Sequence, residues 1–256
     1  MRISATIVAF NEERNIARAI RSLRLGEGCV DEIVVVDSGS SDSTREVALR
    51  LGARVIEEPW RGYAGQKNFA SQCATFDWIL SIDADEAVTE ELEAEILALK
   101  RDGPRCDGYS MPRLAQYLGR WITHSGWYPD RKVRLFHRQK AEWVGEYVHE
   151  SVRVTGSVGE FEGKLLHFTC DSLSQHLRTL DRYTTLAAQE LMAKGSPVPM
   201  SRMLVDPAWT FVRTYVIRRG FLDGPQGLAI AWMAALYTFL KYAKVWQERA
   251  LRESGR

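Results

Sequence analysis

The first hundred residues alternate short apolar runs with longer stretches in which apolar residues recur at helical spacing. Four apolar runs predict strands, at Ile3–Ala9, Glu32–Asp37, Arg54–Glu57 and Trp78–Asp83. The stretches between and after them predict helices, over residues 13–25, 43–51, 65–74 and 90–100, the last with Thr89 as its N-cap. Strands and helices in alternation are typical of βαβ units, so we expect an α/β fold with a mostly parallel, Rossmann-like sheet.

Beyond residue 107 the pattern changes twice. Strand-like pieces at residues 109–113, 133–137 and 165–168 are separated by Gly, Pro and aromatic residues, which indicates an extension of the sheet. From residue 171 onward helical spacing returns, with breaks at residues 195–197 and 220–227. We therefore divide the chain into residues 1–107, 108–170 and a C-terminal helical extension at 171–256.

Composition is that of a globular protein. The 256 residues are 45% apolar and 26% charged, with a formal net charge of +1. The four cysteines lie far apart without a C-x-x-C pair, which favours neither a zinc site nor a disulfide framework. The N-terminal stretch lacks the features of a secretory signal, so we expect a cytoplasmic protein, and no nucleic-acid partner.

Polar, acid-bearing loops follow three of the predicted strands. Residues 10–13 follow the first strand, residues 37–42 the second and residues 83–86 the fourth. In open α/β sheets ligands bind outside the carboxyl ends of the strands. We therefore expect the three loops to form one site at one edge of the sheet.

Two carboxylates, Asp83 and Asp85, follow the apolar run of the fourth strand. If the strand continued for two residues, both would point to the same side and could share Mg²⁺ or Mn²⁺. Such a cation would neutralise the charge that grows on a diphosphate leaving group during glycosyl transfer. The pair alone fits a solvated turn or a helix N-cap equally well. A third acid, Glu86, and the neighbouring acidic loops favour the cation, because so many like charges are costly together.

Asp37 ends the second apolar run and is followed by small residues. Its carboxylate could accept a hydrogen bond from a ribose hydroxyl or a uracil imide, while Ser38 and Gly39 let a nucleoside come close. The same residues fit a strand-to-helix turn in which Asp42 or Ser43 caps the next helix. The two interpretations are compatible.

The three loops together resemble the successive motifs of the family 2 inverting glycosyltransferases with the GT-A fold. The similar segments are residues 6–13, 35–44 and 81–86, and residues 62–70 are similar to the stretch before the fourth strand. The resemblance implies that residues 1–107 are the nucleotide-sugar-binding half of a GT-A domain and residues 108–170 its acceptor-side half.

The resemblance also implies roles for single residues. Asp37 would contact the base, Asp83 the ribose or phosphate, and Asp85 the metal. The remaining implied nucleotide-sugar contacts are Ala9, Asn11, Glu12, Ser38 and Gly39. Lys67 could meet a phosphate or balance the acids, although a solvated helix lysine is equally common.

Later segments are similar to the branch of that family that includes lipopolysaccharide inner-core β-1,4-glucosyltransferases. They are residues 128–136, Trp143, residues 148–150 and residues 165–168. This second resemblance implies transfer of a hexose, with glucose favoured, from a UDP-sugar. The implied acceptor is a glycan or lipid-linked saccharide in lipopolysaccharide core synthesis.

An inverting transfer requires a carboxylate that takes the proton from the acceptor hydroxyl. Glu150 is our candidate, with His149 placed to orient it or the acceptor; an exposed glutamate beside a packed histidine is the alternative. Arg131 and Arg134, on one probable strand, are expected to share a face and bind an anionic acceptor or the diphosphate, unless they are simply solvated. His167 is either a second metal ligand or a structural histidine.

The C-terminal region is the basic end of the chain, with nine Lys/Arg and four Asp/Glu from residue 196 onward. Its most apolar stretch, residues 228–240, is too short to span a bilayer, which takes about 20 residues. It either packs on the core or lies at the cytoplasmic face of the inner membrane. The interfacial residues would then be Trp232, Tyr237, Lys241, Tyr242, Lys244, Trp246 and Arg249.

Other functions fit the pattern less well. A haloacid-dehalogenase-type phosphatase carries its Asp-x-Asp after the first strand, whereas here the pair follows the fourth. A sugar-nucleotide pyrophosphorylase needs a Gly-rich loop after its first strand, and dinucleotide binding needs G-x-G-x-x-G after a strand. A non-catalytic sugar-nucleotide-binding protein is the non-enzymatic alternative.

Overall fold

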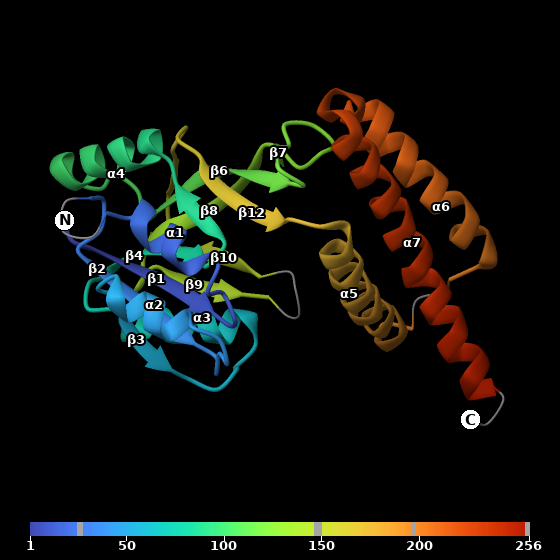
Figure 1. Cartoon of the computed structure of the whole chain (residues 1–256), viewed down its shortest axis with the longest axis horizontal. Coiled ribbons are helices and arrows are strands. Elements are labelled where there is room, and N and C mark those ends of the chain that lie inside the picture. Colours follow the sequence, from blue (N-terminus) through green and yellow to red (C-terminus); the bar gives the residue numbers. More distant parts are fainter. Residues whose placement is uncertain (25–27, 146–149, 196–197, 254–256) are drawn as a thin grey trace. The chain divides into compact units, whose positions relative to one another are not determined.

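The computed structural model describes residues 1–24, 28–145, 150–195 and 198–253 (Figure 1). The chain forms two compact units. Met1–Leu114 and Pro129–Phe168 make up the first, which we call the sheet unit; Ala115–Tyr128 and Thr169–Arg256 make up the second, the helical unit. The predicted α/β class is confirmed.

The first half of the sheet unit follows the predicted alternation. Its elements are β1 (Ile3–Ala9), α1 (Ile16–Ser22), β2 (Glu32–Asp37), α2 (Thr44–Arg50), β3 (Arg54–Glu57), α3 (Tyr63–Cys73), β4 (Trp78–Asp83), β5 (Glu86–Val88) and α4 (Glu90–Asp102). The predicted bounds of the first four strands agree with the structure, whereas the helix ends differ by a few residues. Helix ends are poorly defined by sequence because the last turn often frays or tightens.

The later strands build an antiparallel extension. They are β6 (Gly108–Tyr117), β7 (Arg120–Trp121), β8 (Asp130–His137), β9 (Ala141–Val144), β10 (Ser151–Val154), β11 (Val158–Glu160) and β12 (Leu165–Cys170). Within the described residues one sheet has the order β3-β2-β1-β4-β8-β6-β12-β5, with β7 and β11 beside β6, and β9 pairs with β10 separately. The pairs among β1, β2, β3 and β4 are parallel, whereas β8 is antiparallel to both β4 and β6.

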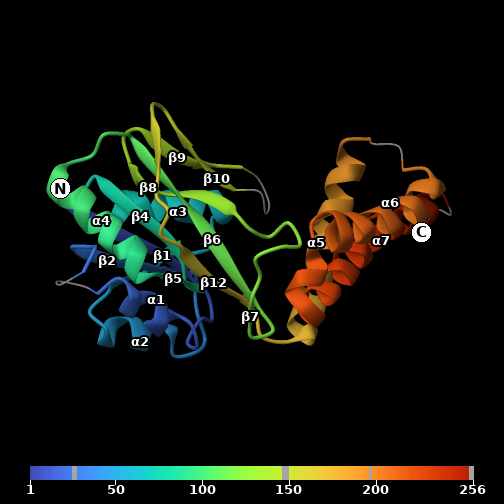
Figure 2. The same ribbon diagram turned by 90° about the horizontal axis from the view of Figure 1, so that it is seen from above.

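Both faces of β1, β2 and β4 are covered, which explains their largely apolar runs. In β2, Ile33 and Val35 belong to the core shared with α1, α2 and α4. Val34 and Val36, which point the other way, pack with Ala70 of α3. Figure 2 shows α1 and α2 on one side of the sheet and β9 and β10 on the other. This double cover fixes where β1, β2 and β4 end, and so where the loops after them lie.

The helical unit contains α5 (Leu173–Ala193), α6 (Met200–Val212), the π-helix η1 (Arg213–Ile217), the 3-10 helix η2 (Gly220–Asp223) and α7 (Gly224–Glu253). The apolar stretch 228–240 lies inside α7, which continues beyond it at both ends. The predicted stretch by itself is shorter than a bilayer requires, but the helix that contains it is longer. By length and composition alone, the helical segment Gly220–Arg252 is long and apolar enough to cross a membrane. Of its most apolar stretch, 28% is buried inside the protein.

Two residues of the predicted membrane interface on α7 face the protein instead. Tyr242 is buried and donates a hydrogen bond to Asp206 of α6 at 2.8 Å. Lys244 Nζ lies 2.7 Å from the Asp181 carboxylate of α5 and 2.7 Å from the Thr185 hydroxyl. Their polar ends are satisfied within the helical unit, so they are not available to lipid.

Thr89 caps the N-terminus of α4, as predicted, and its contribution to stability can be measured. Thr89 is extended, with φ −80° and ψ 162°, and its hydroxyl accepts a hydrogen bond from Leu92 N at 3.3 Å. We expect Thr89→Ala to lower the free energy of unfolding by about 1 kcal/mol, while Thr89→Ser retains the cap. Urea denaturation measures the difference, and equal stability of the two variants would contradict the assignment.

Candidate active site

The loops after β1 and β2 are tied together by hydrogen bonds. Ser38 N donates to Ala9 O at 3.0 Å, and Asn11 N donates to the Ser40 hydroxyl at 2.8 Å. Asn11 adopts φ +56°, a left-handed conformation that asparagine tolerates better than most residues, and its side-chain oxygen accepts from Ser41 N at 2.8 Å. The first two predicted loops therefore form one rigid edge of the sheet unit.

Asp37 shapes its own loop. It is fully buried, and its Oδ1 accepts from Gly39 N at 3.0 Å and from Ser40 N at 2.8 Å, while Oδ2 accepts from the Ser40 hydroxyl. Gly39 has φ +91°, which suits a residue without Cβ. The structure thus contains the strand-to-helix turn that was one of the two interpretations, and a contact of Asp37 with a base stays a prediction.

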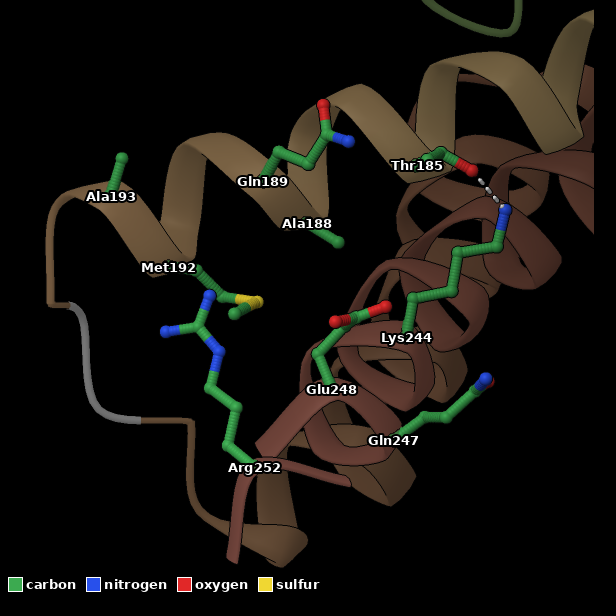
Figure 3. Close-up of a pocket in the computed structure, with 9 residues that line it drawn as sticks. All are labelled: Thr185, Ala188, Gln189, Met192, Ala193, Lys244, Gln247, Glu248 and Arg252. Atoms are coloured by element: carbon green, nitrogen blue, oxygen red, sulfur yellow. Dashed lines mark hydrogen bonds between the residues drawn. The ribbon is translucent and has the colours of Figure 1, made fainter. Parts of the chain in front are cut away.

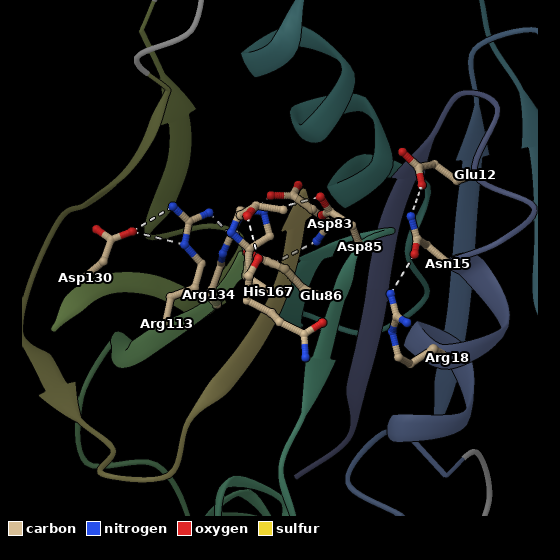
Figure 4. Close-up of polar contacts among 12 residues, drawn as sticks. Glu12, Asn15, Arg18, Asp83, Asp85, Glu86, Arg113, Asp130, Arg134 and His167 are labelled. Atoms are coloured by element: carbon tan, nitrogen blue, oxygen red, sulfur yellow. Dashed lines mark hydrogen bonds and ion pairs between the residues drawn. The ribbon is translucent and has the colours of Figure 1, made fainter. Parts of the chain in front are cut away.

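Glu12 experiences the charge of the neighbouring acids. Burial raises the pKa of its carboxyl, and the charges of Asp85, Asp42 and Asp83 raise it further, against a hydrogen bond from Asn15 that lowers it. β1 pairs with both β2 and β4, with Ala9 opposite Asp37 and Val8 opposite Asp83, so the loops after these three strands lie side by side. The predicted convergence of the loops is therefore present in the structure, and Figure 4 shows Glu12 of the first loop together with Asp83 and Asp85 of the third.

The two aspartates after β4 do not lie on one continuing strand. The strand ends at Asp83, a turn follows, and β5 begins at Glu86, whose carboxylate closes the turn by accepting from Asp83 N at 2.9 Å. The expectation that Asp83 and Asp85 point to one side of an extended strand is therefore wrong. The turn gives the two carboxylates different neighbours.

Asp83 is held between two cations. Its Oδ1 lies 2.8 Å from Lys67 Nζ of α3, and its Oδ2 lies 2.8 Å from Arg134 Nη2 of β8. Although burial alone would raise the pKa of Asp83, Arg134 and Lys67 outweigh it and hold that pKa well below its usual range. Both oxygens of this carboxylate are thus already paired.

The pairing continues on both sides as a chain of alternating charges. Arg134 Nη2 also lies 2.7 Å from Glu86 Oε1, and Lys67 Nζ lies 3.2 Å from Glu150 Oε1. Burial would lower the pKa of Arg134, but the carboxylates of Asp83 and Glu86 raise it. In order, the chain is Asp130, Arg113, Glu86, Arg134, Asp83, Lys67 and Glu150.

The acids at the end of β4 are largely neutralised by basic side chains of the protein. Three acids at one strand end were expected to require a bound cation, but Lys67, Arg134 and Arg113 balance much of that charge themselves. The case for a metal therefore depends on Asp85, which lies outside the chain of ion pairs.

The indole ring of Trp143 supports both central cations. Lys67 Nζ lies 4.4 Å from its centroid and the Arg134 guanidinium carbon 5.4 Å, within the range of cation–π attraction. The side-chain amide of Asn68 anchors the Trp143 backbone: Nδ2 donates to Trp143 O and Oδ1 accepts from Trp143 N, both at 2.9 Å. The link between α3 and β9 thus fixes Lys67, which is 5% exposed, in the position where it meets Glu150.

Glu150, the predicted base, is connected to the ion-pair network by its contact with Lys67. Its side chain is 19% exposed and lies at the edge of the network. Glu150 follows residues 146–149 and directly precedes β10 of the antiparallel extension, whereas Lys67 comes from α3 beside the parallel strands. His149, the residue expected to orient Glu150, lies outside the described residues.

Arg131 and Arg134 do not share a set of partners. Arg131 Nη2 donates to Phe161 O at 2.7 Å and lies 3.3 Å from Glu160, whereas Arg134 faces Asp83. The register of β8 against β6 shifts here: Val133 pairs with Ser110 and Leu135 with Tyr109, leaving Arg134 between them. A bulge of this kind redirects a side chain. The expectation that the two arginines share a face is wrong already for a regular strand, because positions three apart point to opposite faces; in the structure the two arginines have different partners.

Asp85 and His167 form a separate pair. Asp85 Oδ2 lies 3.3 Å from His167 Nε2, and Phe168 N donates to Asp85 O at 2.9 Å, which fixes the turn against β12. Within residues 1–24, 28–145, 150–195 and 198–253, no three Asp, Glu, His or Cys side chains gather as a metal site. An oxygen-preferring divalent cation therefore fits here only if other ligands, such as phosphate oxygens and water, complete its coordination.

A cavity of ≈ 540 Å³ lies elsewhere, between α5 and α7 of the helical unit (Figure 3). Lys244 lines it while remaining bonded to Thr185. It contains none of the predicted site residues, so we assign it no part in the chemistry.

Sequence reasoning gave no role to three members of the network. Glu86 was noted only as an extra acid, and Arg113 and Trp143 were not assigned to the charge balance. Arg113 was detectable as a charged residue within a largely buried strand, where charge usually marks pairing. The position of Trp143 depends on packing between α3 and β9, for which the sequence contains no local signal.

Comparison with known protein families identifies the family to which the chain belongs. The sequence profile described as Glycosyl transferase family 2 matches residues 4–154. The chain therefore belongs to glycosyl transferase family 2 and is a glycosyltransferase. The resemblance found in the three loops is confirmed.

Similar proteins span nearly the whole chain. An uncharacterised glycosyltransferase of Rickettsia typhi is 32% identical, with 95% of this chain and 86% of that protein covered. LpsC of Rhizobium meliloti, a lipopolysaccharide core biosynthesis glycosyltransferase, is 33% identical over 98% and 94% of the two chains. A solved structure of Mycobacterium tuberculosis glucosyl-3-phosphoglycerate synthase with Mn²⁺, UDP and glucosyl-3-phosphoglycerate matches 45% of this chain and 44% of that one, at 26% identity and a TM-score of 0.36. The family assignment rests on the sequence matches.

The depressed pKa of Asp83 makes stability depend on pH. Its ionised form stabilises the fold fully above about pH 3.9, the pKa of an unfolded aspartate, and this contribution is lost as the pH falls below that value. Asp83→Asn should lower the free energy of unfolding at neutral pH by about 2 kcal/mol, less than the 3–5 kcal/mol of a fully buried pair because Asp83 is 28% exposed. Urea titrations at neutral and acidic pH should then show a weaker acid dependence in the variant.

The matched control is Asp77→Asn, which removes a more exposed carboxylate paired with Arg138. It should change stability by less than about 1 kcal/mol. If Asp83→Asn keeps the full acid sensitivity of the unmodified protein, the Lys67–Asp83–Arg134 pairing is not its source.

Proposed function

We propose that this protein is an inverting glycosyltransferase that moves a hexose, glucose in our assignment, from a UDP-sugar to a saccharide acceptor. The observation that carries the proposal is the contact of Lys67 with both Asp83 and Glu150. It brings a donor-side carboxylate and a candidate base together around one buried ammonium group. An inverting transfer needs such proximity, because the acceptor oxygen must attack as the donor bond breaks.

Glu150 is the proposed general base. Proton removal from the acceptor hydroxyl requires an ionised carboxylate within hydrogen-bond reach of it. Lys67 Nζ lies 3.2 Å from Glu150 Oε1 and orients that carboxylate, and the Glu150 side chain is 19% exposed, so an acceptor can approach it. In this role Lys67 positions the base and does not itself transfer the proton.

Asp85 and His167 are the proposed protein ligands of Mg²⁺ or Mn²⁺. When bound, such a cation supplies positive charge to the departing diphosphate. Asp83 would remain with Lys67 and Arg134, whose N–H groups can also be shared with donor phosphate or ribose oxygens. The edge formed by Ala9, Asn11, Glu12 and Asp37 is the proposed place of the nucleoside.

The acceptor is proposed to belong to the lipopolysaccharide core. Support comes from the similarity to LpsC, which is named for core biosynthesis and which this chain matches over most of its length. Such an acceptor carries lipid, so the reaction would occur in the cytoplasm at the inner membrane.

Binding of the donor is tested first. In a thermal-shift experiment, UDP-glucose with Mn²⁺ should stabilise the protein, because a ligand that binds only the folded state at a hundredfold excess over Kd adds about 2.7 kcal/mol. Asp85→Asn should lose the Mn²⁺-dependent part of this stabilisation, whereas Asp102→Asn, an exposed acid at the end of α4, should retain it. Equal Mn²⁺-dependent stabilisation of both variants would exclude Asp85 as a ligand.

Catalysis is tested separately with Glu150→Gln. Removal of a general base should lower kcat by about 10²–10⁴ while leaving the stabilisation by UDP-glucose unchanged. Transfer to a lipopolysaccharide core acceptor is followed as UDP release, with Glu142→Gln of β9 as the control. Full turnover in Glu150→Gln would refute the base assignment, and donor binding without any transfer in the unmodified protein would favour the non-catalytic alternative.

A further inference from the structure

The outward face of α6 and η1 in the helical unit is apolar. Its exposed residues are Leu204, Val205, Trp209, Val212, Val216 and Ile217. Leu204 is 68% exposed and Trp209 54% exposed, and α6 has no buried residue. Positions 205, 209, 212 and 216 follow one another at spacings of three and four, so they form a single stripe on the helix.

The opposite face of α6 packs against α7. Asp206 accepts from Tyr242, the Thr210 and Thr238 hydroxyls lie 3.4 Å apart, and α6 and α7 run side by side in both views (Figures 1 and 2). The side of α6 that faces the protein therefore carries its polar contacts. A helix whose outer side meets water normally turns its apolar residues toward the protein and its polar residues outward. In α6 the apolar stripe faces outward and the polar contacts face the protein.

Aromatic contacts extend this apolar surface onto neighbouring elements. The rings of Phe211 and Trp232 of α7 lie 4.8 Å apart, and those of Tyr215 and Phe221 of η2 lie 6.3 Å apart. Trp232 is 62% exposed, and Phe221 is exposed as well. The surface therefore spans α6, η1, η2 and α7, more than the scattered exposed side chains of an ordinary soluble protein.

The charges beside this surface are almost all positive. Residues 200–219 contain four arginines and one acid, Asp206, which is half-buried and bonded to Tyr242. The arginines, Arg202, Arg213, Arg218 and Arg219, are all exposed. An apolar aromatic face edged by arginines is complementary to a bilayer that contains anionic phospholipids, whose headgroups carry the opposite charge.

We propose that this face, formed by α6, η1, η2 and Trp232, lies in the interface of an anionic phospholipid bilayer. Trp209 and Trp232 sit at the level of the headgroups, the aliphatic stripe enters the acyl boundary, and Arg213 and Arg219 meet lipid phosphates. The surface is independent of the catalytic residues, so its failure would leave the proposed reaction intact.

The same contacts argue that α7 lies beside the membrane and does not cross it. Its buried residues, Ile230, Ala231, Ala235, Tyr242 and Val245, already pack within the helical unit. Crossing would also expose the ion pair of Lys244 and Asp181 to hydrocarbon, where charged groups are strongly disfavoured.

Vesicle flotation of the full chain tests the proposal. We expect binding to phosphatidylcholine vesicles that contain phosphatidylglycerol and much weaker binding to phosphatidylcholine alone. The double variant Leu204→Gln/Trp209→Gln should reduce the partition coefficient at least tenfold, since two apolar side chains no longer leave water. The double variant Leu49→Gln/Trp60→Gln, which alters equally exposed residues of the sheet unit, should bind as the unmodified protein does.

The charge contribution is measured in the same assay. Arg213→Gln/Arg219→Gln should weaken binding to the phosphatidylglycerol vesicles by roughly fivefold for each arginine, and Arg14→Gln/Arg50→Gln of the sheet unit should not. Unchanged thermal stability and unchanged stabilisation by UDP-glucose would establish that the variants are folded.

Four results would overturn the proposal. The first is absence of binding to both kinds of vesicle, and the second is equal binding by Leu204→Gln/Trp209→Gln and the unmodified protein. The third is retention of the protein in cell membranes during alkaline carbonate extraction, which would indicate that α7 spans the bilayer. The fourth is a dimer in analytical ultracentrifugation that the same double variant converts to a monomer, with no vesicle binding.

Discussion

The sheet unit contains two buried basic side chains, Lys67 and Arg134, which must be paired with carboxylates. The arrangement of its strands and helices depends on this pairing. A charged side chain removed from water is tolerated only when it is paired and hydrogen-bonded. Lys67 comes from α3 and Arg134 from β8, and both close on Asp83 at the end of β4. The single carboxylate thereby connects the parallel half of the sheet with the antiparallel extension, and Trp143 lies against both cations.

This constraint gives the two aspartates after β4 different chemistry. Because Asp83 is occupied by Lys67 and Arg134, its part is to fix charge and orientation. Asp85, set apart by the turn and faced by His167, keeps oxygen lone pairs for another ligand. The alternating chain ends at Glu150, so a change in the charge near Asp83 on donor binding would reach the proposed base through one ammonium group. Electrostatic preorganisation of this kind is a large contribution in many enzymes.

Much of the fold could be predicted because its signals are local. The strands β1, β2 and β4 are buried on both faces, which leaves a largely apolar run in the sequence, and Thr89 is a cap recognisable from its neighbours. The site was predictable as a set of polar strand ends. The pairing within it was not, because Lys67 and Glu150 are 83 positions apart and the register shift at Arg134 depends on the partner strand. In the helical unit, composition indicated an aromatic and basic surface, but only packing shows that Tyr242 and Lys244 face inward while Trp209 faces out.

The central claim is that Asp83 and Asp85 have different roles. Asp83 is paired with Lys67 and Arg134, whereas Asp85 is the proposed ligand of Mg²⁺ or Mn²⁺ when the sugar nucleotide is bound. Anomalous diffraction from crystals grown with UDP and Mn²⁺ tests this most directly. The account predicts a manganese peak within coordination distance, about 2.0–2.3 Å, of Asp85 Oδ and His167 Nε2, with Asp83 still bonded to Lys67 and Arg134. A peak coordinated by Asp83, with Lys67 displaced from it, would contradict the account.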